Sequence, residues 1–200
     1  MKKAVISAVL MMFVSFLLGC SSNLMVKSNT NTIVTPPADF AKIVFMRSTF
    51  VSSAIGVELF EITDGELKFV GSLPNGSKIA HITEPGEKVY MAYGNAADFM
   101  LAKVEGGKTY YSIVRPNWGT GGFAPTPIRK NEASDYNMQS DDFNKWVEGT
   151  SLLEKKSEAE QWFEKNKGKY EEIYERYWAR FQNKSADEKQ KRTLMLTDGV

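Results

Sequence analysis

Residues 40 to 129 consist of short runs of β-branched and aromatic residues that are separated by turn sequences. These runs cover residues 42–47, 56–62, 66–71, 77–83, 88–93, 99–105 and 108–114. Asp64-Gly65, which accepts positive φ angles, is typical of the turns between them. Seven strands at this spacing predict an antiparallel β-sandwich, or a partly open barrel, over residues 40–130. The run 42–47 is almost entirely apolar, so we expect a central strand covered on both faces.

A helical period replaces the strand pattern after Ser140. The spacing predicts a short helix at residues 141–147 and a long helix from about Leu152 to Asn183. In the long helix, large apolar residues recur at intervals of three, four and seven, at Trp162, Phe163, Tyr170, Ile173, Tyr174, Tyr177, Trp178 and Phe181. The pattern as a whole predicts an α+β fold, in which a helical C-terminal region (140–200) follows the sandwich.

Three further features refine the C-terminal region. A glycine inside a helix costs about 1 kcal/mol relative to alanine, so Gly168 predicts a kink or a break. The capping box Ser185-Ala-Asp-Glu188 predicts one last short helix. The apolar tail 194–200 is expected to dock on the body of the protein.

The first nineteen residues have the features of a secretory signal peptide. Lys2 and Lys3 precede an apolar run from Ala4 to Leu18, which is too short to span a bilayer as a helix. The sequence Leu17-Leu18-Gly19-Cys20 resembles the lipobox of bacterial lipoproteins, in which the cysteine is acylated and becomes the first residue of the mature chain. The alternative is an ordinary cleaved signal with an incidental cysteine.

The resemblance to a lipobox implies that residues 1–19 are removed. It also implies that Cys20 carries the lipid, whose acyl chains include palmitate. Residues 20–39 would then form a lipid anchor and a flexible tether, because they are polar and end at Pro36-Pro37. A tether of that length reaches at most about 60 Å. By the bacterial sorting pattern, Ser21 after the cysteine favours the periplasmic side of the outer membrane.

Composition excludes several classes of function. The chain has 25 basic and 24 acidic residues, so it lacks the basic surplus of a nucleic-acid-binding protein. Cys20 is the only cysteine and His81 the only histidine, which excludes disulfides and zinc sites with several cysteine or histidine ligands. No calcium loop is present. We therefore expect no metal, no cofactor and no nucleic-acid partner.

The sequence contains no catalytic constellation. Nucleophilic catalysis of the Ser/His/Asp type would have to use His81, with Ser77, Ser112 or Asp98 as partners, and the Gly-x-Ser-x-Gly motif is absent. A single histidine in a predicted strand is usually structural. The expected protein is therefore not an enzyme and has no catalytic residues.

Two groups of aromatic residues are candidate binding surfaces. Trp118 and Phe123 lie among glycines in the segment 115–130, where they would contact a ligand or, alternatively, plug one end of the sandwich. Trp162, Tyr170 and Tyr177 represent the aromatic face of the long helix. That face would contact a protein partner or, alternatively, pack on the β domain.

Short motifs in the β segment are similar to those of a family of bacterial lipoproteins with a domain of unknown function. They are Ala41-Lys-Ile-Val-Phe-Met-Arg47, Asp64-Gly65, Val70-Gly-Ser-Leu73, Asn75-Gly76, Glu84-Pro-Gly-Glu87, Gly106-Gly-Lys-Thr-Tyr-Tyr111 and the ending Met195-Leu-Thr-Asp-Gly-Val200. Lys88 stands where members of that family often have histidine. The resemblance implies a β-sandwich on a lipid anchor and no established activity.

These features predict a non-enzymatic envelope lipoprotein, attached to the membrane through Cys20, that acts as a binding or adaptor module for another envelope component. The aromatic face of the long helix would be its partner surface. The alternative is a protein that binds a small molecule or a glycan at the Trp118/Phe123 end of the sandwich. Hydrolysis by a site around His81 is a third, weaker hypothesis.

Overall fold

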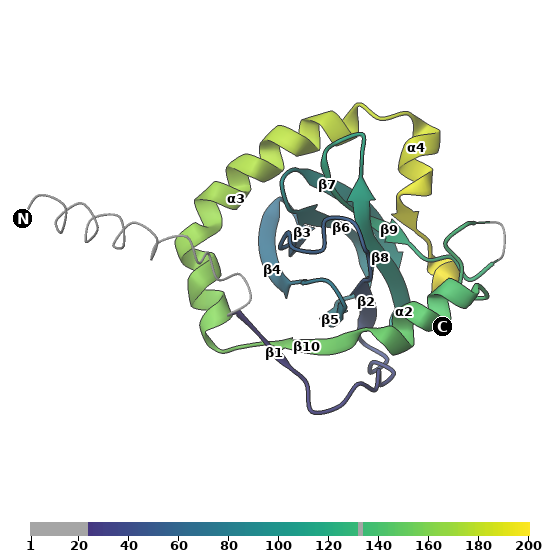
Figure 1. Cartoon of the computed structure of the whole chain (residues 1–200). Helices are drawn as coiled ribbons and strands as arrows, with labels where there is room; N and C mark the ends of the chain where they lie inside the picture. Colours follow the sequence, from purple (N-terminus) through teal and green to yellow (C-terminus); the bar gives the residue numbers. More distant parts are fainter. Residues whose placement is uncertain (1–23, 132–133) are drawn as a thin grey trace, which may run out of the picture.

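A computed structural model describes residues 24–131 and 134–200, and within them eleven strands and three α-helices form a mixed α and β fold (Figure 1). One sheet has six strands, in the order β1 (Met25–Lys27), β10 (Ser151–Lys155), β5 (Ser77–Thr83), β2 (Ala41–Arg47), β8 (Thr109–Asn117) and β9 (Gly122–Pro127). The other has five, in the order β11 (Thr193–Leu194), β7 (Ala97–Val104), β6 (Gly86–Tyr93), β3 (Glu58–Thr63) and β4 (Glu66–Ser72). The helices are α2 (Asp141–Gly149), α3 (Glu158–Gln182) and α4 (Ala186–Lys191).

The seven runs read from the sequence correspond to β2 through β8, but the prediction of a purely antiparallel arrangement of seven strands is wrong. Both sheets are mixed, because β2 pairs in parallel with β8, β5 with β10 and β7 with β11. The sequence pattern predicts where strands lie, but it does not predict which strands pair or in which direction. The strand β9 escaped prediction because it contains Pro125 and Pro127, which an edge strand tolerates.

The segment predicted to be a tether contributes a strand to the six-stranded sheet. β1 pairs antiparallel with β10, and the N–H of Lys156 donates to the carbonyl of Leu24 at 3.0 Å. The side chains of Leu24 and Met25 are buried in the main core. From residue 24 onward the chain is therefore part of the folded body, which corrects the prediction of a tether over the whole of 20–39.

The long helix begins later than predicted and continues without interruption. Residues 151–155 form the strand β10, and α3 starts only at Glu158. Gly168 lies inside a continuous helix of 25 residues, so the predicted break is wrong. Figure 1 shows α3 arching along the five-stranded sheet, from β4 to β7. None of the described helices is long and apolar enough to cross a membrane.

The two sheets share one core, in which the rings of Phe45 on β2 and Tyr90 on β6 have centroids 5.1 Å apart. On the other face of β2, Val44 and Met46 belong to a smaller cluster with residues of α2. Every residue of β2 is buried. This confirms the prediction of a central strand covered on both faces.

Three local predictions are confirmed. Asp64 and Gly65 have φ angles of 54° and 83° in the turn between β3 and β4. The capping box at Ser185 is present at the start of α4. The C-terminal tail docks: Leu194 is buried, and the N–H of Val200 donates to the carbonyl of Thr109 at 3.0 Å.

Candidate ligand-binding groove

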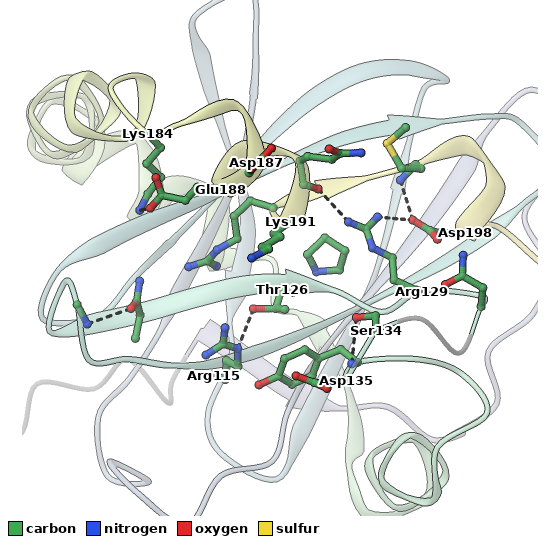
Figure 2. A pocket seen from close by; sticks show the side chains of 18 of the residues that line it. Arg115, Thr126, Arg129, Ser134, Asp135, Lys184, Asp187, Glu188, Lys191 and Asp198 are labelled. Carbon is green, nitrogen blue, oxygen red and sulfur yellow. Dashed lines mark hydrogen bonds and ion pairs between the residues drawn. The ribbon is translucent and has the colours of Figure 1, made fainter.

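A groove of about 1020 Å³ lies between the β8–β9 hairpin and the C-terminal segment (Figure 2). The hairpin supplies Arg115 and Thr126, the loop after β9 supplies Arg129 and Tyr136, and the segment from α4 onward supplies the opposite wall. Five basic and four acidic side chains line it. The groove is therefore polar and rich in charge, and Arg115 is one of its lining residues.

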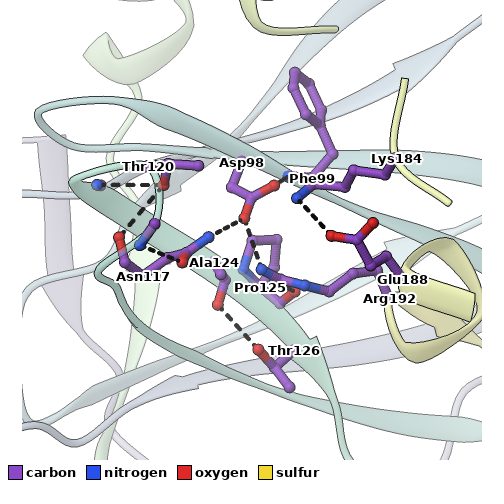
Figure 3. Close-up of polar contacts among 12 residues, drawn as sticks. Asp98, Phe99, Asn117, Thr120, Ala124, Pro125, Thr126, Lys184, Glu188 and Arg192 are labelled. Atoms are coloured by element: carbon purple, nitrogen blue, oxygen red, sulfur yellow. Dashed lines mark hydrogen bonds and ion pairs between the residues drawn. The ribbon is translucent and has the colours of Figure 1, made fainter. Parts of the chain in front are cut away.

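One wall of the groove is fixed through Asp98, a buried residue of β7 (Figure 3). Its Oδ2 accepts from Nη2 of Arg192 at 2.7 Å and from Nδ2 of Asn117 at 2.6 Å. Nη1 of Arg192 also donates to the carbonyl of Pro125 at 3.1 Å. Asp98 thus joins β7, the β8–β9 hairpin and the residue that follows α4.

Arg129 fixes the same wall closer to the C-terminus. Its Nη1 lies 2.7 Å from Oδ2 of Asp198, and its Nη2 donates to the carbonyl of Gln190 at 3.0 Å. Asp198 in turn accepts from the N–H of Met195 at 2.8 Å. Since both charged groups are largely buried and hydrogen-bonded, this ion pair organises the C-terminal segment.

Arg115 is held in a different way. Its Nε donates to Oγ1 of Thr126 at 3.1 Å, and its guanidinium lies 5.0 Å from the centre of the Tyr136 ring. Burial lowers the pKa of Arg192; the Asp98 carboxylate opposes that shift and the nearby positive charge of Arg115 adds to it. Arg115 therefore brings a second guanidinium close to one that is already paired.

The acidic residues of the lining have different roles. Asp198 is paired with Arg129, and Glu188 caps α4 through the N–H of Ser185 while lying 3.9 Å from Lys184. Asp135 and Asp187 make no ion pair within 4.0 Å among the described residues. A ligand of this groove would meet both a cationic group and carboxylates that accept hydrogen bonds.

The structure separates the two aromatic residues that were predicted to contact a ligand together. Trp118 is 78% exposed in the turn between β8 and β9, next to the groove residues Asn117 and Gly119. Phe123 is only 2% exposed, and its ring lies under the guanidinium of Arg47 at 4.4 Å. Phe123 is thus a core residue, as the alternative held, whereas Trp118 stands beside the groove.

The aromatic face of α3 packs against the five-stranded sheet and is not a free surface. Tyr170 lies 4.6 Å from Phe60 and is 2% exposed, and Trp162 lies 5.3 Å from Phe69 (ring centroids). Tyr177 is partly buried against the same core. The structure thus places Tyr170 in the core and leaves Trp162 and Tyr177 partly buried against it, which is the alternative of packing on the β domain.

His81 does not form a catalytic triad with its predicted partners. Its Nε2 lies 2.7 Å from Oε2 of Glu61, and the hydroxyl of Tyr90 donates to the same oxygen at 2.8 Å. Asp98 is bound to Arg192, as described above, and Ser112 donates to the carbonyl of Thr126. His81 therefore joins the two sheets through a buried carboxylate.

No group of three potential metal ligands occurs within residues 24–131 and 134–200. Cys20 and the predicted signal peptide, residues 1–19, lie outside the described residues. The groove was missed because its arginines, Arg115, Arg129 and Arg192, are far apart in the chain and match no motif. Only Arg115 and Arg129 fall in the segment 115–130 that the sequence marked as unusual.

Comparison with known proteins adds no family to these observations. No protein-family model and no curated protein matches this chain. Its function therefore has to be inferred from its own residues.

Proposed function

We propose that this chain is a non-enzymatic, lipid-anchored envelope protein that binds a small-molecule ligand in the groove between the β8–β9 hairpin and the C-terminal segment. In this proposal the two sheets form an open β-sandwich that serves as a scaffold. The groove carries the proposal, because it is a concave site of about 1020 Å³ lined by convergent polar groups. The hypothesis of a protein partner on the aromatic face of α3 is less favoured, since that face is packed on the sheet.

The ligand site lies beside the aromatic end that the sequence suggested. Trp118 is exposed near the rim of the groove, whereas Phe123 is unavailable to a ligand. The proposal therefore adopts the alternative function, small-molecule or glycan binding, and moves its site toward Arg115 and Tyr136.

The lipid anchor depends on the sequence around Cys20 and has its own test. We expect Cys20→Ser to leave an uncleaved or soluble precursor, because the thiol is the acylation site. Membrane fractionation and the mass of the intact protein measure this. Unchanged fractionation together with unchanged mass would refute the anchor and leave the groove untouched.

The ligand can be sought with the mature protein in detergent. Equilibrium dialysis against small molecules and glycans extracted from the envelope, followed by mass spectrometry, should retain one or a few compounds. Gln190→Trp places a large side chain in the groove from α4, at a position where the native side chain is exposed. It should abolish retention of the compound by the protein. Glu171→Trp on the exposed face of α3 is the matched control and should keep it. Equal retention by both variants, or none by the native protein, contradicts the proposal.

A further inference from the structure

The groove contains three arginines, and two of them bind protein acceptors through both terminal nitrogens. Arg129 binds Asp198 and the carbonyl of Gln190, and Arg192 binds Asp98 and the carbonyl of Pro125. These two guanidiniums are used to hold the C-terminal wall. They have little capacity left for a ligand.

Arg115 is the exception. Only its Nε is used, by Thr126, and no hydrogen bond or carboxylate within 4.0 Å engages Nη1 or Nη2 in the part of the chain that the structure describes. The side chain is half-buried and lines the groove (Figure 2). Its two terminal nitrogens are therefore donors that face the groove without a protein acceptor.

The free end of Arg115 is also fixed in orientation. The hydrogen bond from Nε fixes one edge of the guanidinium, whose central carbon lies over the Tyr136 ring, 5.0 Å from its centroid. What remains is the edge formed by Nη1 and Nη2, a planar fork that matches the two oxygens of a carboxylate or a phosphate. Because the fork is already oriented, binding such a group costs little side-chain entropy.

We propose that Arg115 is the anchoring residue of the groove and that it binds the carboxylate or phosphate group of the ligand. This inference depends on the proposed function, since it names the chemical class of the compound that the groove takes. Asp135 and Asp187 line the same groove, so the compound also carries hydroxyl or amino groups that donate to carboxylates. A small polar oxyanion, rather than an apolar compound, is the expected ligand.

The test uses the mature lipidated protein in detergent micelles, titrated with inorganic phosphate and separately with acetate at constant ionic strength. Amide and arginine Nε signals are followed by nuclear magnetic resonance. We expect saturable shifts at Arg115, Thr126 and Tyr136. A response to phosphate alone identifies a phosphate ligand, and a response to acetate alone identifies a carboxylate ligand.

Four variants distinguish specific binding by the Arg115 guanidinium from general attraction to positive charge. Arg115→Gln should weaken binding about tenfold or more, and Arg115→Lys, which keeps the charge without the fork, several-fold. Lys191→Gln removes another charge of the lining, and Arg180→Gln removes an exposed charge on α3 outside the groove. Arg180→Gln should leave the dissociation constant within about twofold, and Lys191→Gln should weaken binding less than Arg115→Gln does. Unfolding temperatures of all variants confirm that each is folded.

Several outcomes overturn the inference. Shifts that never saturate, or a dissociation constant that Arg115→Gln leaves unchanged, exclude the anchoring role. Equal losses in Arg115→Gln and Lys191→Gln would show that binding follows net charge only. If dialysis finds a groove ligand without an oxyanion, this inference fails while the proposed function stands. If Gln190→Trp leaves the retention of compounds unchanged and the titrations show no shifts, both the proposed function and this inference fail.

Discussion

Glu61 is a carboxylate buried at the junction of the two sheets, where His81 of β5 and Tyr90 of β6 both bind it. Burial alone would raise its pKa, but the hydrogen bond and charge of His81, together with the hydroxyls of Thr83 and Tyr90, lower the pKa of Glu61 to about 2. The native protein therefore favours the ionised carboxylate. In the unfolded chain the same group has a pKa near its usual 4.5.

This difference predicts a loss of stability in acid. Because the folded pKa is depressed, the contribution of Glu61 is complete above about pH 4.5 and disappears as the pH falls toward 2. The loss amounts to at most about 3 kcal/mol. Urea unfolding between pH 6 and pH 2 measures it. Glu61→Gln should flatten the pH dependence, whereas Glu171→Gln on the exposed face of α3 should not. A slope that Glu61→Gln leaves intact would contradict this assignment.

Arg47 is a completely buried arginine that ties a loop to the body of the protein. Its Nη1 donates to the carbonyls of Ile55 and Leu73 at 2.7 and 3.0 Å, and its Nη2 donates to the carbonyl of Ser52 at 2.8 Å. The face of the guanidinium covers Phe123. One side chain thus binds three backbone carbonyls, of which only that of Ser52 has a local donor as well, the N–H of Ile55 at 3.2 Å.

Replacing Arg47 should be strongly destabilising. Burial lowers the pKa of Arg47 to about 10, against the opposing charge of Glu58, so the group is still protonated at neutral pH. We expect Arg47→Met to lower the free energy of unfolding by about 3 kcal/mol, since it leaves the carbonyls of Ile55 and Leu73 without a donor and takes one of two donors from the carbonyl of Ser52. Urea unfolding followed by circular dichroism measures the change. Arg180→Met at an exposed position should change it by less than about 0.5 kcal/mol. Equal effects would show that the buried contacts contribute nothing.

At the scale of single residues, the sequence predicted what local rules decide. Asp64-Gly65 and the cap at Ser185 follow from the conformational preferences of the residues themselves. Trp118 and Phe123 are aromatic residues of one short segment, yet one is exposed and the other is buried under Arg47. Phe123 is covered by a residue that lies 76 positions earlier in the chain, and no local pattern contains that relation.

Among the elements, α3 shows how tertiary packing overrides an unfavourable residue. Gly168 lies on the exposed side of the helix, and a Cβ built there meets no atom within 4 Å. The helix is continuous because aromatic residues on both sides of Gly168, Trp162 before it and Tyr170 after it, pack on the sheet. The intrinsic cost of glycine remains, but it does not break the helix.

Gly168→Ala is therefore expected to stabilise the protein. The substitution should raise the free energy of unfolding by about 1 kcal/mol, because alanine fits the space and loses less backbone entropy. Gly71→Ala is the opposite control: its φ is +153°, and a Cβ would lie 2.8 Å from Cδ1 of Ile79, so it should be destabilising. Thermal unfolding distinguishes the two. A native Tm or a lower one for Gly168→Ala would show that the glycine relieves strain in the curved helix.

Three of the strands that the sequence missed, β1, β10 and β11, have partners that lie far away in the chain. Ser151-Leu-Leu-Glu-Lys155 consists largely of good helix formers, which is why it was assigned to the long helix. In the structure it pairs with β5 on one side and β1 on the other. β5 would otherwise be the edge of the sheet, with unpaired backbone groups. The geometry of the sheet, and not the propensity of the segment, decides its conformation.

For the whole molecule, these strands mean that a division at residues 130–140 does not separate two units. β1, β10 and β11 come from outside the predicted sandwich, and together they extend both sheets. Because β1 belongs to the sheet, the segment between the proposed anchor at Cys20 and the folded domain is shorter than the predicted tether. Only residues 21–23 lie between Cys20 and the buried Leu24. Four Cα–Cα steps span at most about 14 Å, far less than the 60 Å of a full tether.

If Cys20 is lipidated as proposed, the body of the protein is held against the membrane near β1. Lys27→Cys adds an exposed thiol to β1, and it is the only free one because the sulfur of Cys20 is alkylated. A dye at Lys27→Cys should be quenched strongly by lipids that carry a nitroxide on the headgroup. A dye at Asp187→Cys, on α4 beside the opposite edge of the sheet, should be quenched several-fold less, because five strand spacings cover about 24 Å.

An insertion supplies the decisive control for this membrane position. Twenty Gly/Ser residues placed between Ser22 and Asn23 should lower the quenching at position 27 to the level at position 187, because the lengthened link lets the domain move away from the bilayer. The protein must remain in the membrane fraction throughout, so that a failed anchor is not mistaken for a distant domain. Equal quenching at the two positions in the membrane-bound protein without the insertion would show that the short link does not set the position of the domain.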